Sequence, residues 1–356
     1  MSLQKSPVSK FPGGKIINIQ ALRGIAVLLV VAYHLSKIET KYGHGELLLP
    51  KLTAIGMSGV DLFFVISGFV MVTVTRGWFQ KQGSVGRFLY HRISRIYPTY
   101  WFYSLIVLAI FLYRPDIVNS SQGSNVNIIS SFLLLPQDQL PLLSVGWTLI
   151  HEMYFYLVFA LLLLFQEKRL LPLLLIWGIL VAILPHENNA VLMLVTHPLT
   201  FEFIAGALIA LLLQRRVIGG GWVAFAALPV WFLAYSFYVY QGGELEPDGW
   251  PRVMLFGIPS VLAVYGVVAM EMKSGRQFTG WLKIIGDASY SIYLSHLLVI
   301  SAMGRIWSTI WQQGLLDNGV AMMAILLMVL IVGIISYRFL ERPLMRLTRR
   351  YEGLVK

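Results

Sequence analysis

The sequence predicts an all-α membrane protein with about ten transmembrane helices and with both termini in the cytoplasm. Two compositional observations and one pattern predict it. Hydrophobic residues make up 57% of the 356 residues and charged residues only 13%, and long apolar stretches recur along the chain. A soluble domain carries about one-quarter charged residues, and a helix that spans a bilayer needs about 20 apolar ones. We therefore expect one transmembrane domain over residues 1–356.

Hydropathy divides the chain into ten predicted spans, of which the fifth and sixth are short. The first span follows a polar and basic segment, lacks a small-residue cleavage site and is followed by further spans, so it is not expected to be a signal peptide. The long loop 114–144 contains an apolar piece, 132–135, expected to form a re-entrant or interfacial turn. The predicted spans are 20–38, 57–75, 97–113, 145–165, 170–184, 198–213, 222–240, 251–271, 287–308 and 319–340.

The distribution of basic residues supports this count and its orientation. With the N-terminus inside, all but six of the 28 Lys and Arg residues fall in cytoplasmic segments, as the positive-inside rule requires. An odd number of spans would break this alternation. The formal charge of +11 is thereby explained by topology, so no nucleic-acid partner is expected. The residues left outside are Lys37, Lys41, Lys51, Arg114, Arg252 and Arg305.

The first predicted span contains two residues that are costly in lipid, Arg23 and His34. Ionisable side chains inside a bilayer mark functional sites by default. Eleven residues correspond to about three helical turns, so both side chains lie on one face, roughly 16 Å apart along the axis. The alternatives are an interfacial anchor for Arg23 and a hydrogen-bonded packing role for His34.

Two further arginines, Arg92 and Arg95, are predicted at the cytoplasmic ends of the spans, near Arg23. The planar guanidinium group binds phosphate in a bidentate manner. These three arginines are therefore candidates for binding a phosphorylated cofactor that enters from the cytoplasm. The alternative for Arg92 and Arg95 is a purely topological role as positive-inside residues.

Deeper in the predicted bundle, His34 is accompanied by two acids, Asp61 and Glu152. A neighbouring carboxylate can orient an imidazole and stabilise its charged form, which suits general-base catalysis. His34, Asp61 and Glu152 are therefore the candidate catalytic residues. His151 is adjacent to Glu152, so only one of the two can face the centre, and Glu152 is favoured.

Three other residues are candidates for substrate binding, namely Trp147, Tyr156 and His296. The alternative for the two aromatic residues is packing or an interfacial belt, and His296 could equally be structural. The chain has no cysteine, so neither disulfides nor cysteine metal ligands are expected, and no metal site is predicted.

Six motifs, in order, resemble the integral-membrane acyltransferase family three, which includes bacterial O-antigen, Nod-factor and exopolysaccharide acetylases. Each motif alone would be a weak signal, but together they cover nearly the whole chain. They are Leu22-Arg-Gly-Ile-Ala-Val with Tyr33-His34, Gly59-Val-Asp-Leu-Phe-Phe-Val-Ile-Ser-Gly-Phe69, Arg92-Ile-Ser-Arg-Ile-Tyr-Pro98, Trp147-Thr-Leu-Ile-His-Glu-Met-Tyr-Phe-Tyr156, Gly286-Asp-Ala-Ser-Tyr-Ser-Ile-Tyr-Leu-Ser-His296 and Glu341-Arg-Pro343.

The resemblance implies an O-acetyltransferase of the bacterial inner membrane. Its donor would be cytoplasmic acyl-CoA, usually acetyl-CoA, and its acceptor a hydroxyl of an exopolysaccharide, lipopolysaccharide O-antigen or lipid-linked oligosaccharide, beside polysaccharide-synthesis machinery. If the roles of the family's first-helix motif apply to this chain, Arg23 would face the donor's phosphates and His34 would be the catalytic base. His91 departs from the family pattern, in which arginine is common. The chain is expected to lack the SGNH-type hydrolase domain that many relatives carry.

Two mechanisms and two other functions stay open at this level. His34 could activate the acceptor directly or could carry the acetyl group as a covalent relay. A secondary transporter or exporter of glycan intermediates would also use ionisable residues in the membrane, although the absence of a repeat and the one-sided arginines count against it. A non-catalytic scaffold would not explain the buried histidine and acids.

Overall fold

The computed structural model describes residues 16–43, 48, 51–118, 125–185, 189–217, 219–278, 280–310 and 315–350. Within these residues all regular structure is helical, which confirms the predicted all-α class. The α-helices are α1 Asn18–Tyr42, α2 Ser58–Val74, α3 Ser84–Tyr113, α4 Ile128–Leu133, α5 Gly146–Leu162, α6 Leu170–Ile183, α7 Ala190–Val195, α8 Thr200–Gln214, α9 Val223–Tyr240, α10 Gly249–Arg252, α11 Ile258–Ser274, α12 Trp281–Asp287, α13 Ser289–Ile310, α14 Leu315–Ser336 and α15 Arg342–Arg350.

The structure has fewer candidate spans than the ten predicted. Among the described residues, seven helical segments are long and apolar enough to cross a membrane, and α12 with α13, bent by 79°, would make an eighth. The predicted spans 145–165 and 170–184 correspond to α5 and α6, which have only 17 and 14 residues. Hydropathy overestimates the length of the span 145–165, because the apolar residues continue past the end of α5 into a turn.

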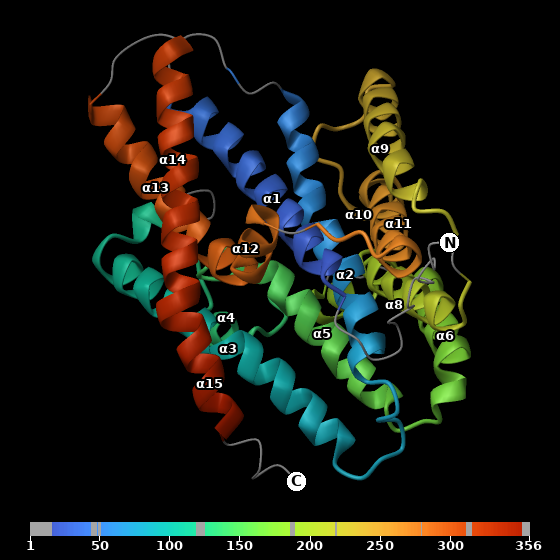
Figure 1. Ribbon diagram of the computed structural model, residues 1–356. Helices are drawn as coiled ribbons and strands as arrows, with labels where there is room; N and C mark the ends of the chain where they lie inside the picture. Colours follow the sequence, from blue (N-terminus) through green and yellow to red (C-terminus); the bar gives the residue numbers. More distant parts are fainter. Residues whose placement is uncertain are drawn as a thin grey trace, which may run out of the picture.

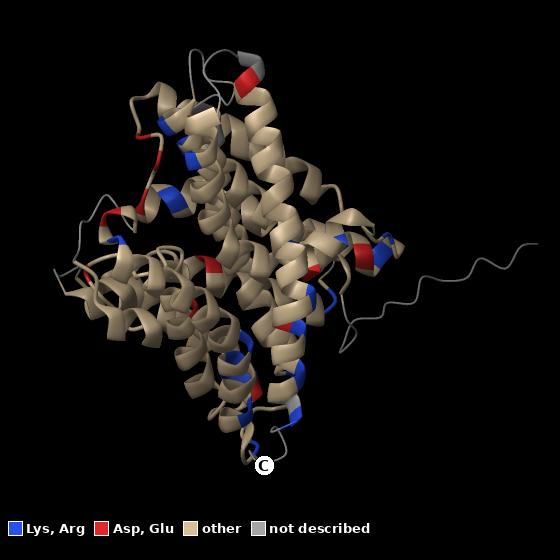
Figure 2. Ribbon diagram, turned by 90° about the vertical axis from the view of Figure 1, so that its left-hand side faces the viewer, with Lys and Arg blue, Asp and Glu red and all other residues tan. Residues whose placement is uncertain are grey.

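The placement of the two termini stays a prediction, since residues 1–15 and 351–356 lie outside the described residues. Lys and Arg residues gather at the end of the molecule where α3 begins and α15 ends (Figure 2). This is the end that the charge pattern predicts to be cytoplasmic.

Helix α1 lies in the middle of the bundle, where it contacts α2, α12 and α13 (Figure 1). Helices α13, α14 and α15 lie along one side of it, and α8, α9 and α11 lie along the other. At the start of α1, the Glu271 carboxylate accepts hydrogen bonds from the backbone N–H groups of Ile17 and Asn18, at 3.0 and 2.8 Å. A carboxylate at a helix N-terminus satisfies free donors and complements the helix dipole, so it fixes the end of α1 that carries Arg23.

Glycines let the helices around α2 approach one another closely. A Cβ atom on Gly68 of α2 would lie 1.9 Å from the carbonyl oxygen of Phe203 in α8. Likewise, a Cβ atom on Gly206 of α8 would lie 1.9 Å from the carbonyl oxygen of Val65 in α2. Small residues at such crossings are typical of membrane helices, whose association depends on close packing rather than on the hydrophobic effect.

We predict that Gly68→Ala destabilises the protein, because the new methyl group would displace backbone rather than a flexible side chain. Overpacking of this kind costs about 1–3 kcal/mol. The measurement is the thermal unfolding midpoint of the purified protein in detergent. Gly178→Ala is the matched control, since its Cβ atom would lie an ordinary 3.4 Å from the Phe201 ring. Equal midpoints for both variants would contradict the prediction.

Candidate active site

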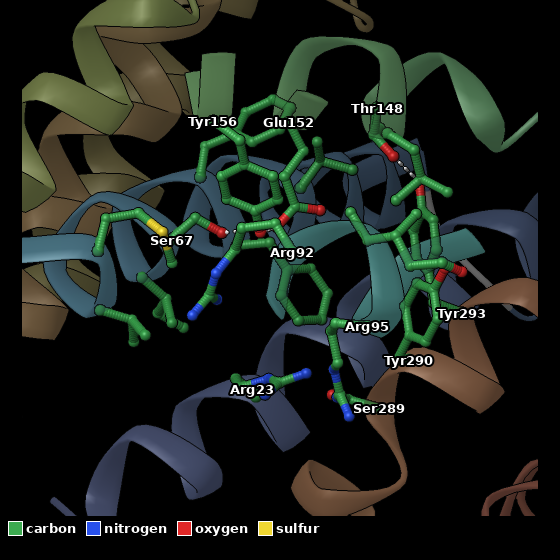
Figure 3. Close-up of a pocket in the computed structure, with 18 of the residues that line it drawn as sticks. Arg23, Ser67, Arg92, Arg95, Thr148, Glu152, Tyr156, Ser289, Tyr290 and Tyr293 are labelled. Atoms are coloured by element: carbon green, nitrogen blue, oxygen red, sulfur yellow. Dashed lines mark hydrogen bonds between the residues drawn. The ribbon is translucent and has the colours of Figure 1, made fainter. Parts of the chain in front are cut away.

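A cavity lies between α1, α2, α3, α5 and α13, and we call it the arginine cavity. Arg23 reaches it from α1, Arg92 and Arg95 from α3, and Glu152 and Tyr156 from α5 (Figure 3). The structure therefore brings together the three arginines predicted to bind a cofactor, although α1 and α3 are separated by another helix in the sequence.

The arginine cavity contains two guanidinium groups that no carboxylate contacts directly among the described residues. Arg95 pairs with the buried Glu341 at 2.8 Å, so its charge is largely compensated. By contrast, within the described part of the chain neither Arg23 nor Arg92 has a carboxylate within 4.0 Å. The Nε atom of Arg92 is buried without a hydrogen-bond partner there. Two unpaired guanidinium groups on one cavity suit an anionic ligand such as a phosphate.

The acid in this cavity, Glu152, is occupied by neighbouring hydroxyl groups. Its Oε1 atom accepts a hydrogen bond from Ser67 at 3.1 Å and a short one from Tyr156. Glu152 therefore lies with the arginines rather than beside His34. Tyr156, predicted to bind substrate, lines the same cavity, and the Arg92 guanidinium lies over its ring at 5.6 Å.

A second cavity is lined by the predicted catalytic histidine, and we call it the histidine cavity. His34, Tyr33, Trp147 and Arg252 are among the residues that line it. Val60 and Tyr293 line both cavities. The Tyr293 hydroxyl group lies 2.8 Å from that of Thr148, which lines the arginine cavity. The two cavities are therefore adjacent, with the Tyr293 side chain between them.

The ring of His34 is oriented by a second histidine. Nδ1 of His296 lies 2.6 Å from the carbonyl oxygen of Tyr293, so this nitrogen carries the proton and Nε2 is an acceptor. Nε2 of His296 lies 3.3 Å from Nδ1 of His34, which is also 2.9 Å from the carbonyl oxygen of Val30. Nδ1 of His34 is thus the donor, and Nε2 of His34 carries the lone pair that a general base needs.

The predicted partners of His34 are not the ones the structure places beside it. Asp61 forms a bidentate pair with Arg252, with Nε–Oδ1 and Nη2–Oδ2 distances of 2.9 Å. Both side chains are buried, and the Arg252 guanidinium lies 5.6 Å from the Trp147 ring centre. A guanidinium fork is a stronger partner for a carboxylate than a neutral imidazole, so Asp61 holds Arg252 rather than His34.

The candidate substrate-binding residues separate into different positions. Trp147 lines the histidine cavity and Tyr156 the arginine cavity, whereas His296 is fully buried against His34. His296 is thus placed to position His34 and not to touch a substrate. The charge pattern places Arg252 outside the membrane, although it lies inside the predicted span 251–271, so the sequence alone does not identify it as a site residue. The rule that ionisable residues within spans mark functional sites would have identified it.

The sequence profile of the family-three acyltransferase domain matches residues 16–338 of this chain. The chain belongs to acyltransferase family three. It is therefore an acyl-transferring enzyme, and this membership counts against the transporter alternative. Its several apolar helices make this acyltransferase a multi-pass membrane protein.

Curated relatives of this acyltransferase cover most of its length. It is 30% identical to the exopolysaccharide production protein ExoZ of Rhizobium meliloti, over 82% of this chain and 90% of the relative. It is 26% identical to the acyltransferase MdmB of Streptomyces mycarofaciens, over 94% and 93%. The match to the O-acetyltransferase OatA of Staphylococcus aureus, at 24% identity, covers 92% of this chain but 57% of that protein. No solved structure matches the chain.

We predict that Asp61→Ala destabilises this acyltransferase strongly, because it leaves the Arg252 charge buried and unpaired. Removal of one partner of a buried ion pair costs about 3–5 kcal/mol. Thermal unfolding in detergent measures the change. Asp116→Ala is the matched control, since Asp116 forms a similar bidentate pair with Arg114 on the surface and should show no measurable effect. A wild-type midpoint for Asp61→Ala would refute the expectation.

Proposed function

We propose that this enzyme transfers an acetyl group from acetyl-CoA to a hydroxyl group of a glycan. The observation that carries the proposal is the contact between the two cavities at Val60 and Tyr293. One cavity offers unpaired guanidinium groups and the other offers the free Nε2 atom of His34. The printed names of two relatives, an exopolysaccharide production protein and an O-acetyltransferase, support a glycan acceptor.

The arginine cavity is proposed to bind the phosphorylated part of the donor. Arg23 and Arg92 would contact its phosphate groups, with Arg95 held in place by Glu341 at the edge of the same cavity. The donor's flexible arm would then extend past Val60 and Tyr293 toward His34. Since the arginine cavity is expected to face the basic end of the molecule, acyl-CoA would enter from the cytoplasm.

The reaction is proposed to be direct transfer with His34 as general base. Nε2 of His34 accepts the proton of the acceptor hydroxyl, and the hydroxyl oxygen attacks the carbonyl carbon of the thioester. The carbon–sulfur bond then breaks, and His34 returns the proton to the departing sulfur. The products are the O-acetylated glycan and the free thiol of CoA, so atoms and charge balance.

The remaining assignments extend this proposal from the family to which the chain belongs. The acceptor is an exopolysaccharide, O-antigen or lipid-linked oligosaccharide that enters the histidine cavity past Trp147. The enzyme would reside in the bacterial cytoplasmic membrane, in contact with lipid and next to polysaccharide-synthesis proteins.

We predict that His34→Gln abolishes acetyl transfer while the variant still binds acetyl-CoA, because binding and base catalysis use different cavities. Transfer of radioactive acetyl groups to glycan and equilibrium binding of the donor measure the two properties. His151→Gln is the matched control. His151 also approaches the carbonyl group four residues earlier, Trp147, at 3.0 Å, but it lines neither cavity. Full transfer by His34→Gln would refute the mechanism. Detection of acetylated His34 in trapped wild-type enzyme would support a covalent relay instead of direct transfer.

We predict that Arg23→Gln weakens acetyl-CoA binding and leaves turnover at saturating donor near the wild-type value. A hydrogen bond to a charged group contributes about 1.5–3 kcal/mol, so the dissociation constant should rise roughly tenfold to a hundredfold. Isothermal titration of the purified protein measures this. Lys273→Gln removes an exposed charge from a segment also expected on the cytoplasmic side and serves as control. Equal affinity in the Arg23 variant and the control would contradict the donor site.

A further inference from the structure

Arg252 is a buried cation in the histidine cavity that the proposed proton transfer does not use. Arg252 is only 4% exposed, yet it lines the cavity that contains His34. It lies at the end of α10, immediately before the π-helical turn Val253–Gly257 that leads into α11. A charge so deep in a membrane protein is costly, so its position needs a physical reason.

The hydrogen bonds of Arg252 hold one side of its guanidinium group and leave the other side available. Nε and Nη2 bind the two carboxylate oxygens of Asp61, and Nη2 also lies 3.4 Å from the carbonyl oxygen of Met57. These contacts use three of the five N–H donors of an arginine. Both N–H groups of Nη1 have no hydrogen-bond partner among the residues that the structure describes.

The guanidinium group is held rigidly by its surroundings. Asp61, itself fully buried in α2, fixes it from one direction, and the Trp147 ring lies 5.6 Å away from its central carbon. A donor that is already oriented needs no reorganisation when charge develops nearby, and this is the main requirement for electrostatic catalysis.

The charges around Arg252 indicate which kind of ligand its free donors suit. Asp61 balances the charge of Arg252, and the Glu202 and Asp248 carboxyl groups also interact with it electrostatically. Such a site has no excess positive charge with which to hold a permanent anion. Its two N–H groups suit a neutral carbonyl oxygen that becomes negative only during the reaction.

We propose that Nη1 of Arg252 binds the carbonyl oxygen of the acyl group and stabilises the oxyanion of the tetrahedral intermediate. As the acceptor oxygen bonds to the carbonyl carbon, the carbonyl oxygen gains negative charge. Its electron pair re-forms the carbon–oxygen double bond when the carbon–sulfur bond breaks, and the electrons of the broken bond leave with the sulfur, which takes the proton from His34. Arg252 gains and loses no proton. Asp61 is then a positioning residue, which acts by fixing Arg252. This inference rests on the proposed acyl transfer.

The test is Arg252→Lys, which keeps a cation for Asp61 but lacks the second terminal nitrogen of the guanidinium fork. We measure kcat and both KM values for acetyl transfer to glycan, together with hydrolysis of acetyl-CoA without acceptor. Both reactions pass through a tetrahedral intermediate. Loss of one oxyanion donor should lower kcat by about 10²- to 10³-fold, with the KM values near wild type and hydrolysis reduced in parallel.

Arg114→Lys is the matched control. Arg114 forms the same bidentate contact with Asp116, through Nε and Nη2, but on the surface and away from both cavities. Its kcat should equal that of the wild type. If Arg252→Lys does not fold, the neutral double variant Asp61→Asn with Arg252→Gln replaces it, since removing both charges leaves none unpaired. The same loss of kcat is expected.

The outcomes separate this inference from the proposed function. Wild-type kcat in folded Arg252→Lys overturns the oxyanion role while acetyl transfer stands. A rise confined to the acceptor KM also overturns it and assigns Arg252 to acceptor binding instead. Failure of the wild-type enzyme to transfer acetyl groups from acetyl-CoA overturns the proposed function and this inference together.

Discussion

A charged side chain inside a membrane protein must find a partner, and this constraint determines how the helices of this acyltransferase fit together. Asp61 with Arg252 joins α2 to the end of α10, and Arg95 with Glu341 joins α3 to the turn before α15. A buried charge without a partner costs several kcal/mol, so each pair fixes two segments that are distant in the sequence. Against this background Arg23 and Arg92 are informative, because they have no such partner among the described residues and face a cavity instead.

Helix α1 contributes residues to both cavities, and its neighbours hold it in place. Close backbone contacts hold the helix from two sides, since Cβ atoms on Gly59 and Gly286 would lie 2.2 Å from the Ala26 carbonyl oxygen and 1.7 Å from that of Gln20. Arg23 and His34 are therefore carried on one fixed element, about 16 Å apart along its axis. Each borders a different cavity, so a single helix fixes the position of the arginine cavity relative to the histidine cavity.

Helix α13 connects the two cavities in a second way. The side chain of Tyr293 lies between them, and its carbonyl oxygen orients His296, which in turn orients His34. The same turn of helix thus both separates the cavities and sets the tautomer of the candidate base. The spacing of three residues between Tyr293 and His296 in this motif brings the Tyr293 carbonyl group within hydrogen-bond distance of the His296 ring.

The sequence by itself determined the all-helical class, the family, and the residues that are costly in a membrane. Composition, hydropathy and ordered motifs are local properties, which folding does not alter. The spacing of Arg23 and His34 on one helix is also local. The tertiary structure decided how many helices are long enough to span, because α5 ends at a turn that hydropathy does not detect. It also decided the partners of the charged residues. Asp61 and Arg252 are 191 residues apart, and His34 and His296 are 262 apart. Such pairs depend on which helices pack together, and that depends on glycine contacts and buried charges that no single segment contains.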